Sequence, residues 1–356
     1  MLAALGREEA RQICVSAQLG VCYGHPLEVI EDTGLIQLDG MSIVAPSHRL
    51  ALLARTRDFT HAQLDSAIWN TPEPRVFETY THAACLLPLT SWPLFREARR
   101  SAMRHVESAD KTLVSKVLNK VGNSSSGLTI GELEDRSSRS KGWNWSEVKS
   151  IVQYLVWSGW LVAARRTRGK RVFSLTESTL PTELLSTELS RDEQLAGFAR
   201  KAVDCLAILT PSDLAFHYNL SHADAQRALQ ITGLDSVQVA DWPEPAYVSA
   251  AVDKLLERTV EPRLIGPFDN LMRDRQRLAR IFGVQYKLEA YTPDAKRLYG
   301  PYAMALFTGS GYLGLIDIRR RGAGFEKPRY FPSQDVESGI FAETADYACR
   351  RLVERF

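Results

Sequence analysis

The chain has 356 residues, 45% of them hydrophobic and 24% charged, and its 44 basic and 42 acidic residues leave a formal net charge of +2. A chain of this length exceeds one small core, so we expect two to four domains of ordinary globular composition. The near balance of charge excludes a uniformly cationic surface, so any affinity for nucleic acid must come from local clusters of Lys and Arg.

The cysteines and the apolar runs indicate the cellular compartment of the protein. Five cysteines, at positions 14, 22, 85, 205 and 349, are scattered and form no Cys-x-x-Cys pair. This pattern argues against a disulfide framework, a zinc ribbon or an iron–sulfur cluster, and it favours a reducing compartment. No apolar run reaches the length of a membrane span, and charges begin at Arg7, too early for a signal peptide. We therefore expect a cytoplasmic protein that does not bind membranes.

The first region centres on Gln37 and Asp39. We interpret residues 35–39 as extended, and side chains two apart in an extended segment point to the same side. Pro46 is tolerated only in the first turn of a helix, so we expect a helix at about residues 43–59, beginning just beyond Asp39. An amide and a carboxylate at the positively polarised start of a helix can hold a water molecule and face a developing cation.

The same residues allow a purely structural interpretation. Asp39 or Ser42 would then only cap the helix, and Gln37 would be a polar strand residue. His82 allows two interpretations as well, because it could face Gln37 and Asp39 or could be a hydrogen-bonded core residue. These elements belong to residues 1–106, which we assign as a first winged helix carrying the Gln37–Asp39 motif.

Residues 107–182 have the element order of a second winged helix. We expect helices at 111–121 and 128–136, a third helix opened by a capping box Asn144-x-x-Glu147, and strands at 160–165 and 171–175. The hairpin tip carries five cations within seven residues: Arg165, Arg166, Arg168, Lys170 and Arg171. A charge run is usually just a solvated face, but at the tip of a wing this density favours contacts with DNA phosphates.

Residues 188–262 repeat this order as a third winged helix, with helices expected at 194–209, 211–218 and 221–232 and a hairpin from residue 237. Its wing is acidic or apolar, with Asp235, Asp241 and Glu244. We therefore expect this region to have a structural role more than to contact a DNA groove. No fixed-period repeat relates the regions, which share element order only.

Residues 263–356 change to a β-rich character. We expect a charged helix at 269–281, strands at 286–291, 301–307 and 312–319, and a closing helix at 336–354. Lys296 and Arg297 would lie at the tip of a hairpin formed by the first two strands. Cations at such a tip can enter a DNA minor groove, although an ordinary solvated turn has the same sequence pattern. The expected fold is α+β, with tandem winged-helix domains and a β-rich C-terminal region.

Four stretches, in the right order and over nearly the whole chain, resemble the winged helix-turn-helix DNA glycosylases that excise alkylated bases and unhook interstrand crosslinks. They are residues 35–55, 76–84, 142–149 and 266–291. The Gln-apolar-Asp motif is similar to the YcaQ-like branch, whereas the azinomycin-resistance branch has Gln-apolar-Gln. Two departures concern the pocket's shape more than its chemistry: Gly40-Met41 replaces the usual hydroxyl and apolar residues, and Thr81 replaces a common aromatic.

The resemblance implies a monofunctional DNA glycosylase that hydrolyses the N-glycosidic bond of N7-alkylated purines in duplex DNA and unhooks interstrand crosslinks. It would act as a monomer without a metal or organic cofactor. An N7-alkylated guanine is already cationic and leaves easily, so the remaining task is to stabilise an oxocarbenium-like sugar and deliver water to C1′. Asp39 is the candidate for cation stabilisation and general base, Gln37 for orienting the water, and His82 for support.

Two other functions stay open on the residues alone. A non-enzymatic winged-helix DNA-binding regulator would use Gln37 and Asp39 purely as structure, and it would bind a palindromic site sequence-specifically. A catalytically dead relative would also retain the motif, and the Gly40-Met41 departure keeps this alternative open. The sequence specifies neither the preferred lesion nor whether a genotoxin made by the same organism is the target.

Overall fold

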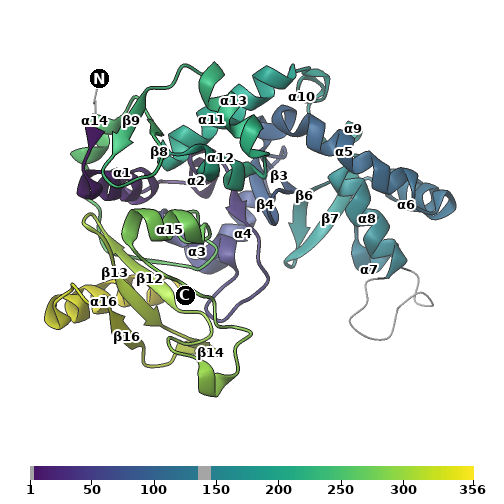
Figure 1. Cartoon of the computed structure of the whole chain (residues 1–356). Coiled ribbons are helices and arrows are strands. Elements are labelled where there is room, and N and C mark those ends of the chain that lie inside the picture. The colour runs from purple at the N-terminus through teal and green to yellow at the C-terminus, as the bar shows by residue number, and fades with distance from the viewer. Residues whose placement is uncertain (1–3, 135–145) are drawn as a thin grey trace. The chain divides into compact units, whose positions relative to one another are not determined.

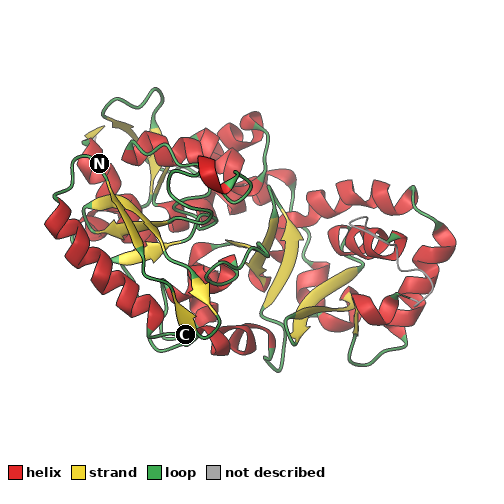
Figure 2. Cartoon of the chain, turned by 90° about the horizontal axis from the view of Figure 1, so that it is seen from below, coloured by secondary structure: helices red, strands yellow, loops and turns green. Residues whose placement is uncertain are grey.

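The computed structural model describes residues 4–134 and 146–356, and helices alternate along it with several small sheets (Figure 2). The predicted α+β class is confirmed. The chain divides into two compact units, the first formed by Met1–Leu64, Thr81–Ala83 and Leu195–Phe356, and the second by Asp65–Tyr80 and Ala84–Gln194. Both units are therefore discontinuous in sequence, since Thr81–Ala83 of the first unit interrupts the second.

The N-terminal part of the first unit contains short elements around the Gln37 motif (Figure 1). They are α1 (Arg7–Leu19), α2 (Pro26–Thr33), β2 (Ile36–Gln37), α3 (Ser47–Leu53) and α4 (His61–Trp69), the division between units falling within α4. The predicted helix at 43–59 is wrong at both ends, because α3 begins at Ser47 and Pro46 lies just before it. A proline disfavours the helical conformation in the residue before it, so Ala45 and its predecessors stay in a loop.

The region predicted as a third winged helix, residues 188–262, has the expected order of three helices and a hairpin. Its elements are α11 (Arg191–Leu206), β8 (Ile208–Leu209), α12 (Pro211–Tyr218), α13 (His222–Ile231), β9 (Ser236–Val239), β10 (Ala246–Val248) and α14 (Val252–Leu256). The helix predicted to reach residue 209 ends at Leu206, because Ala207 takes a left-handed φ of 57° and leads into β8. The sequence did not reveal that β1 (Ala4–Leu5) adds to this sheet, parallel to β9, in the order β1-β9-β10-β8.

The C-terminal region is built on an antiparallel sheet in the order β11-β12-β13-β16. Its elements are β11 (Arg263–Ile265), α15 (Arg275–Phe282), β12 (Met304–Thr308), β13 (Gly311–Asp317), β14 (Arg320–Arg321), β15 (Gly324–Phe325), β16 (Arg329–Pro332) and α16 (Ser338–Val353). Leu315 of β13 packs in one core with Leu278 of α15 and Val15 of α1. On the other face Gly314 approaches Phe341 of α16 so closely that a Cβ would lie 2.6 Å from the ring. Helices therefore cover both faces of this sheet (Figure 1).

The second unit holds a β-hairpin and the region predicted as a second winged helix. Its elements are β3 (Val76–Tyr80), β4 (Ala84–Pro88), a 3₁₀ helix (Leu89–Phe95), α5 (Arg96–Glu107), α6 (Lys111–Gly122), β5 (Leu128–Thr129), α7 (Ile130–Leu133), α8 (Glu147–Trp157), β6 (Leu161–Thr167), β7 (Lys170–Leu175), α9 (Thr176–Thr179) and α10 (Thr182–Ser186). The predicted wing is the β6–β7 hairpin, turning at Arg168 and Gly169, which have φ of 48° and 76°. Two left-handed residues are what a tight two-residue turn requires.

The start of α8 differs from its prediction. Asn144 of the expected capping box lies outside the described residues, and the cap of α8 is Ser146, whose hydroxyl accepts from the Lys149 N–H at 3.3 Å. The apolar side chains of α8 are buried: Ile151, Val152, Leu155 and Val156 lie in one hydrophobic core with residues of α6 and β6.

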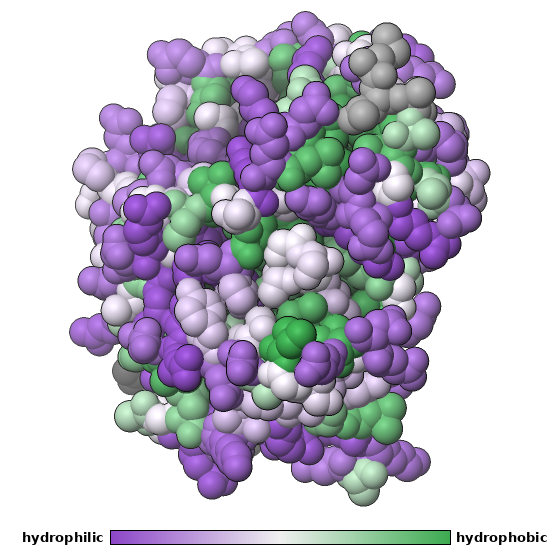
Figure 3. All heavy atoms as spheres, turned by 90° about the vertical axis from the view of Figure 1, so that its left-hand side faces the viewer, coloured by the Kyte–Doolittle hydropathy of each residue, from purple (hydrophilic) through white to green (hydrophobic). Residues whose placement is uncertain are grey.

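Apolar side chains are mostly inside. Within residues 4–134 and 146–356, no helix combines the length and the hydrophobicity that crossing a bilayer requires. On the face drawn in Figure 3, hydrophilic side chains predominate and hydrophobic ones form only small separate groups.

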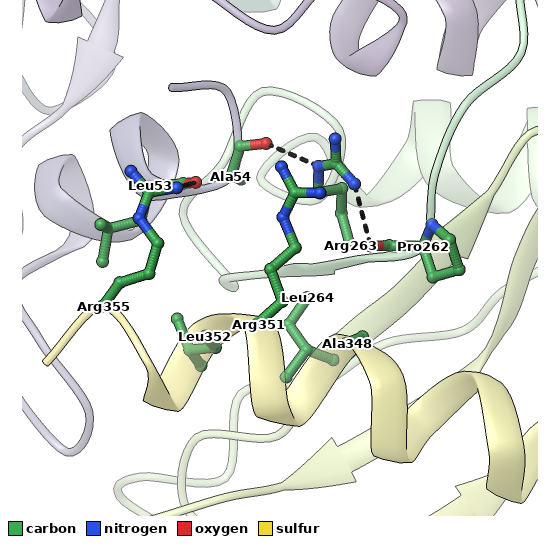
Figure 4. A pocket seen from close by; sticks show the side chains of 9 residues that line it. All are labelled: Leu53, Ala54, Pro262, Arg263, Leu264, Ala348, Arg351, Leu352 and Arg355. Carbon is green, nitrogen blue, oxygen red and sulfur yellow. Dashed lines mark hydrogen bonds between the residues drawn. The ribbon is translucent and has the colours of Figure 1, made fainter. Parts of the chain in front are cut away.

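Two arginines hold the C-terminal end of α3 (Figure 4). Arg263 donates from Nε to the carbonyl of Ala54 at 3.1 Å. Arg355 donates from Nη1 to the carbonyls of Leu53 at 3.1 Å and Thr56 at 2.8 Å. Carbonyls at a helix C-terminus lack partners within the helix and carry a partial negative charge, which a cation stabilises. These contacts fix the helix that follows the Gln37 motif.

Candidate active site

Ser47 fixes the turn that carries Gln37 and Asp39. Its hydroxyl donates to the Gln37 carbonyl at 2.6 Å and accepts from the Asp39 N–H at 2.7 Å. The Asp39 carboxylate accepts from the Met41 N–H at 2.8 Å. The capping interpretation of Asp39 and Ser42 is wrong, since α3 begins only at Ser47 and no side chain caps it.

The two motif side chains differ in exposure. Gln37 is buried, with 9% of its surface exposed, whereas Asp39 is half-buried. A half-buried carboxylate can face a solvent-borne ligand, and a buried amide keeps one orientation if its hydrogen bonds fix it.

A buried ion pair joins two of the stretches that carry the resemblance. Arg55 makes a two-pronged pair with Asp269, at 2.7 and 2.8 Å, and both side chains are almost fully buried. The next residue, Asn270, donates from its amide to the carbonyls of Leu35 at 3.0 Å and Thr33 at 3.3 Å. The segment after β11 therefore holds the strand that leads to Gln37.

The structure brings His82 to Gln37. Nε2 of His82 lies 3.0 Å from Oε1 of Gln37, and Nδ1 lies 3.0 Å from Oγ1 of Thr81. The imidazole also stacks on Phe216, with 5.2 Å between the ring centres. Of the two interpretations of His82, the geometry fits the one in which it contacts the motif.

Arg273 lies next to His82, and sequence reasoning missed it. Its Nη1 is 2.9 Å from each ring nitrogen of His82, and its Nη2 is 2.8 Å from Nδ1 of His217. Burial, and next the Arg273 charge, lower the pKa of His82 to about 3. The same two causes lower the pKa of His217. Both imidazoles are therefore neutral near pH 7. Nothing in the sequence separates Arg273 from the other arginines of its segment.

Tyr302 lies on the Asp39 side of the site. Burial, and next the Asp39 carboxylate, raise the pKa of the Tyr302 hydroxyl, so this group stays protonated. Among the described residues the hydroxyl has no hydrogen-bond partner. Gly266 leaves room beside it, since a Cβ there would lie 3.6 Å from the oxygen.

The five cations predicted at the wing do not behave alike. Arg168 and Lys170 at the turn are exposed. Arg166 instead pairs with the buried Glu78, at 2.6 Å, and its guanidinium lies 4.2 Å from the centre of the Trp69 ring. Arg165 is exposed, and its guanidinium lies 3.5 Å from the Pro72 carbonyl. Arg171 is half-buried over the Phe173 ring and lies 3.9 Å from the Glu78 carboxylate.

The predicted hairpin around Lys296 and Arg297 is wrong. Residues 286–291 form no strand, and a short 3₁₀ helix, Asp294–Lys296, lies in a long loop before β12. Arg297 turns inward and donates to the carbonyls of Glu289 at 3.0 Å and Thr292 at 2.8 Å. The Glu289 carboxylate accepts from backbone N–H groups further along the loop. These side chains replace the ladder that a hairpin would have. Of the two predicted cations, Lys296 is exposed and Arg297 is half-buried.

Within the part of the chain that the structure describes, no three His, Cys, Asp or Glu side chains are grouped so that they could hold a metal ion.

Comparison with known proteins defines the class. The family model described as "DNA glycosylase AlkZ-like" matches residues 30–348, which is most of the chain. The protein belongs to the AlkZ-like DNA glycosylase family and is a DNA N-glycosylase of DNA repair. Its fold is similar to that of the DNA glycosylase AlkZ of Streptomyces sahachiroi, with a TM-score of 0.65 over 99% of this chain and 98% of that chain, at 15% sequence identity. The predicted enzyme class is confirmed.

Proposed function

We propose that the enzyme excises N7-alkylated purines from duplex DNA, with Asp39 as general base and Gln37 orienting the attacking water. The neutral His82 beside Gln37 is the observation that supports this substrate class. With a pKa of about 3, His82 is neutral near pH 7, and a neutral imidazole is too weak an acid to protonate a leaving base. An N7-alkylated purine is already cationic and leaves without such a proton.

In this mechanism the Asp39 carboxylate removes a proton from water while the water oxygen bonds to C1′. The C1′–N9 bond breaks, and its electrons neutralise the charge of the N7-alkylated base. The negative charge of Asp39 stabilises the positive charge that develops on the sugar. Ser47 holds the backbone on both sides of Leu38, which keeps the carboxylate and the amide in place.

Interstrand crosslinks formed through N7 of guanine fall in the same substrate class. A crosslinked base cannot swing into a deep pocket, because it is tethered to the other strand. The half-exposed position of Asp39 suits such a base better than an enclosed site would. We also propose that the enzyme acts as a monomer in the cytoplasm, where its five free cysteines stay reduced.

The test is base release from three duplexes that differ only in the lesion. We expect release from the duplex with N7-methylguanine and unhooking of an N7-linked guanine crosslink. We expect no release of uracil, a neutral base. Failure to release N7-methylguanine would contradict the proposed substrate, and equal release of uracil would contradict the argument from His82.

A further inference from the structure

Arg273 is one of the most enclosed charged side chains near the motif, with 7% of its surface exposed. Besides its contacts with His82 and His217, its Nε donates to Oδ1 of Asn270 at 2.9 Å. Asn270 in turn holds the Leu35 carbonyl, two residues before Gln37. One guanidinium thus contacts both the side chain that touches Gln37 and the residue that supports its strand.

The hydrogen-bond donors and acceptors around His82 can all be satisfied when Nε2 is protonated and Nδ1 is not. An arginine N–H only donates, so the His82 nitrogen that receives it must be unprotonated. The carbonyl oxygen of the Gln37 side chain only accepts, so Nε2 of His82 must carry the proton. Nδ1 then has the lone pair that Arg273 needs.

The reverse arrangement has a conflict. If the Gln37 amide were turned, its NH₂ group and the Arg273 Nη1 would both donate to the single lone pair on Nε2 of His82. In the first arrangement the Thr81 hydroxyl also faces Nδ1, but it can turn its proton elsewhere, whereas an amide N–H cannot.

We propose that Arg273 is a positioning residue, which sets the direction of the Gln37 amide through His82. With its oxygen bound to His82, Gln37 presents its NH₂ group, which donates to the oxygen of the attacking water. This role rests on the proposed function of Gln37 and does not place Arg273 in contact with DNA or water.

As a consequence, the protonation state and the tautomer of His82 do not change around neutral pH. Among the described residues, Arg273 contacts the His82 ring, and the neutral His217 lies beyond that arginine. With a pKa of about 3, His82 neither gains a proton nor exchanges its tautomer as the pH varies around neutrality. Gln37 therefore keeps one direction.

The test compares Arg273→Met, Arg273→Lys and the matched control Arg275→Met. Arg275 lies in the same segment but donates to the Pro267 carbonyl at 3.0 Å and packs on the Tyr286 ring. Single-turnover release of N7-methylguanine at saturating enzyme should fall about tenfold or more in Arg273→Met, because the amide direction is lost. Arg273→Lys, which keeps the charge and a donor, should recover part of the rate. Arg275→Met should retain the wild-type rate, and the dissociation constant for DNA should change little in all three.

A direct measurement separates positioning from mere packing. Nitrogen chemical shifts of isotope-labelled histidine should show His82 neutral and protonated at Nε2 in the wild type between about pH 5 and about pH 8. In Arg273→Met we expect a raised pKa and a mixture of tautomers, and in Arg275→Met the wild-type signals.

Three outcomes would overturn the proposal: an Nδ1-protonated His82 in the wild type, unchanged His82 signals in Arg273→Met, or a wild-type rate in that variant. These signals are read without DNA, so they stay informative even if the wild type fails to release N7-methylguanine, which would contradict the proposed function alone.

Discussion

The Gln37–Asp39 turn and the tip of the β6–β7 hairpin are both polar. The turn is fixed by hydrogen bonds within the protein, whereas the cations at the tip are exposed to solvent. Around Gln37, contacts with Ser47, His82 and Asn270 fix the backbone or the side chain. At the hairpin tip, Arg168 and Lys170 are exposed. Chemistry at a single atom needs the first kind of region, because small misplacements are costly, whereas phosphate contacts tolerate mobile cations. The comparison predicts that changes at the turn alter rate and stability, and changes at the tip alter affinity.

The largest effect should come from Asp39→Asn. Removing a carboxylate that stabilises the developing cation should raise the barrier by about 3 kcal/mol or more, a loss of at least about a hundredfold. Binding to lesion DNA should remain, and Gln37→Ala should slow release less. Single-turnover release and DNA affinity measured on the same duplex check this. Base release by Asp39→Asn at the wild-type rate would show that Asp39 is not catalytic.

The next effect concerns Ser47→Ala. This change leaves the buried Gln37 carbonyl and the Asp39 N–H without their partner, which should lower the free energy of unfolding by about 2 kcal/mol and slow base release. The matched control is Ser16→Ala, since the Ser16 hydroxyl is buried without a hydrogen-bond partner among the described residues. Denaturant unfolding should show no loss for the control. Equal loss in both variants would mean that Ser47 matters only through packing.

Contacts of the hairpin tip with DNA should be visible in the salt dependence of DNA affinity. Each lost phosphate contact takes nearly one unit from the slope of log affinity against log salt, so Arg168→Ala with Lys170→Ala should lower the slope by about two. Between about 50 and 200 mM salt this makes the change in Kd about tenfold smaller. Arg166→Ala should leave the slope unchanged and lower the melting temperature, because Arg166 pairs with Glu78. An unchanged slope in the double variant would show that the tip does not contact DNA.

The smallest effect separates Lys296 from Arg297. Arg297→Ala should cost about 1 kcal/mol of stability, because carbonyls of the loop lose their donor. Lys296→Ala should leave the melting temperature unchanged, because this side chain is exposed. If Lys296 contacts DNA, its loss should weaken binding without changing stability. The melting temperatures of both variants check this. An unchanged melting temperature in Arg297→Ala would mean that Arg297 does not stabilise the loop.

Local patterns predicted much of this fold. The helices predicted at 111–121 and 211–218 depend on near neighbours in sequence, and they are found at Lys111–Gly122 and Pro211–Tyr218. The tip of the β6–β7 hairpin was predictable for the same reason.

The failures have a common physical cause. β1 pairs with β9 across more than half of the chain, and Arg297 replaces a strand ladder by binding carbonyls in its own loop. Such partners leave no periodic mark in the sequence. The candidate site shows the same limit: Gln37 and Asp39 could be found from their spacing and their resemblance, but the burial of Arg273 beside His82 follows only from tertiary packing.

The pairing of β1 with β9 sets the order in which the protein can be completed during synthesis. The ribosome releases residues 1–64 of the first unit long before residues 195–356 exist. Until then the Gln37 segment lacks Asn270, Arg55 lacks Asp269, and β1 lacks β9. The elements that make the enzyme active are thus assembled last, so a nascent chain still on the ribosome carries the motif without its chemistry.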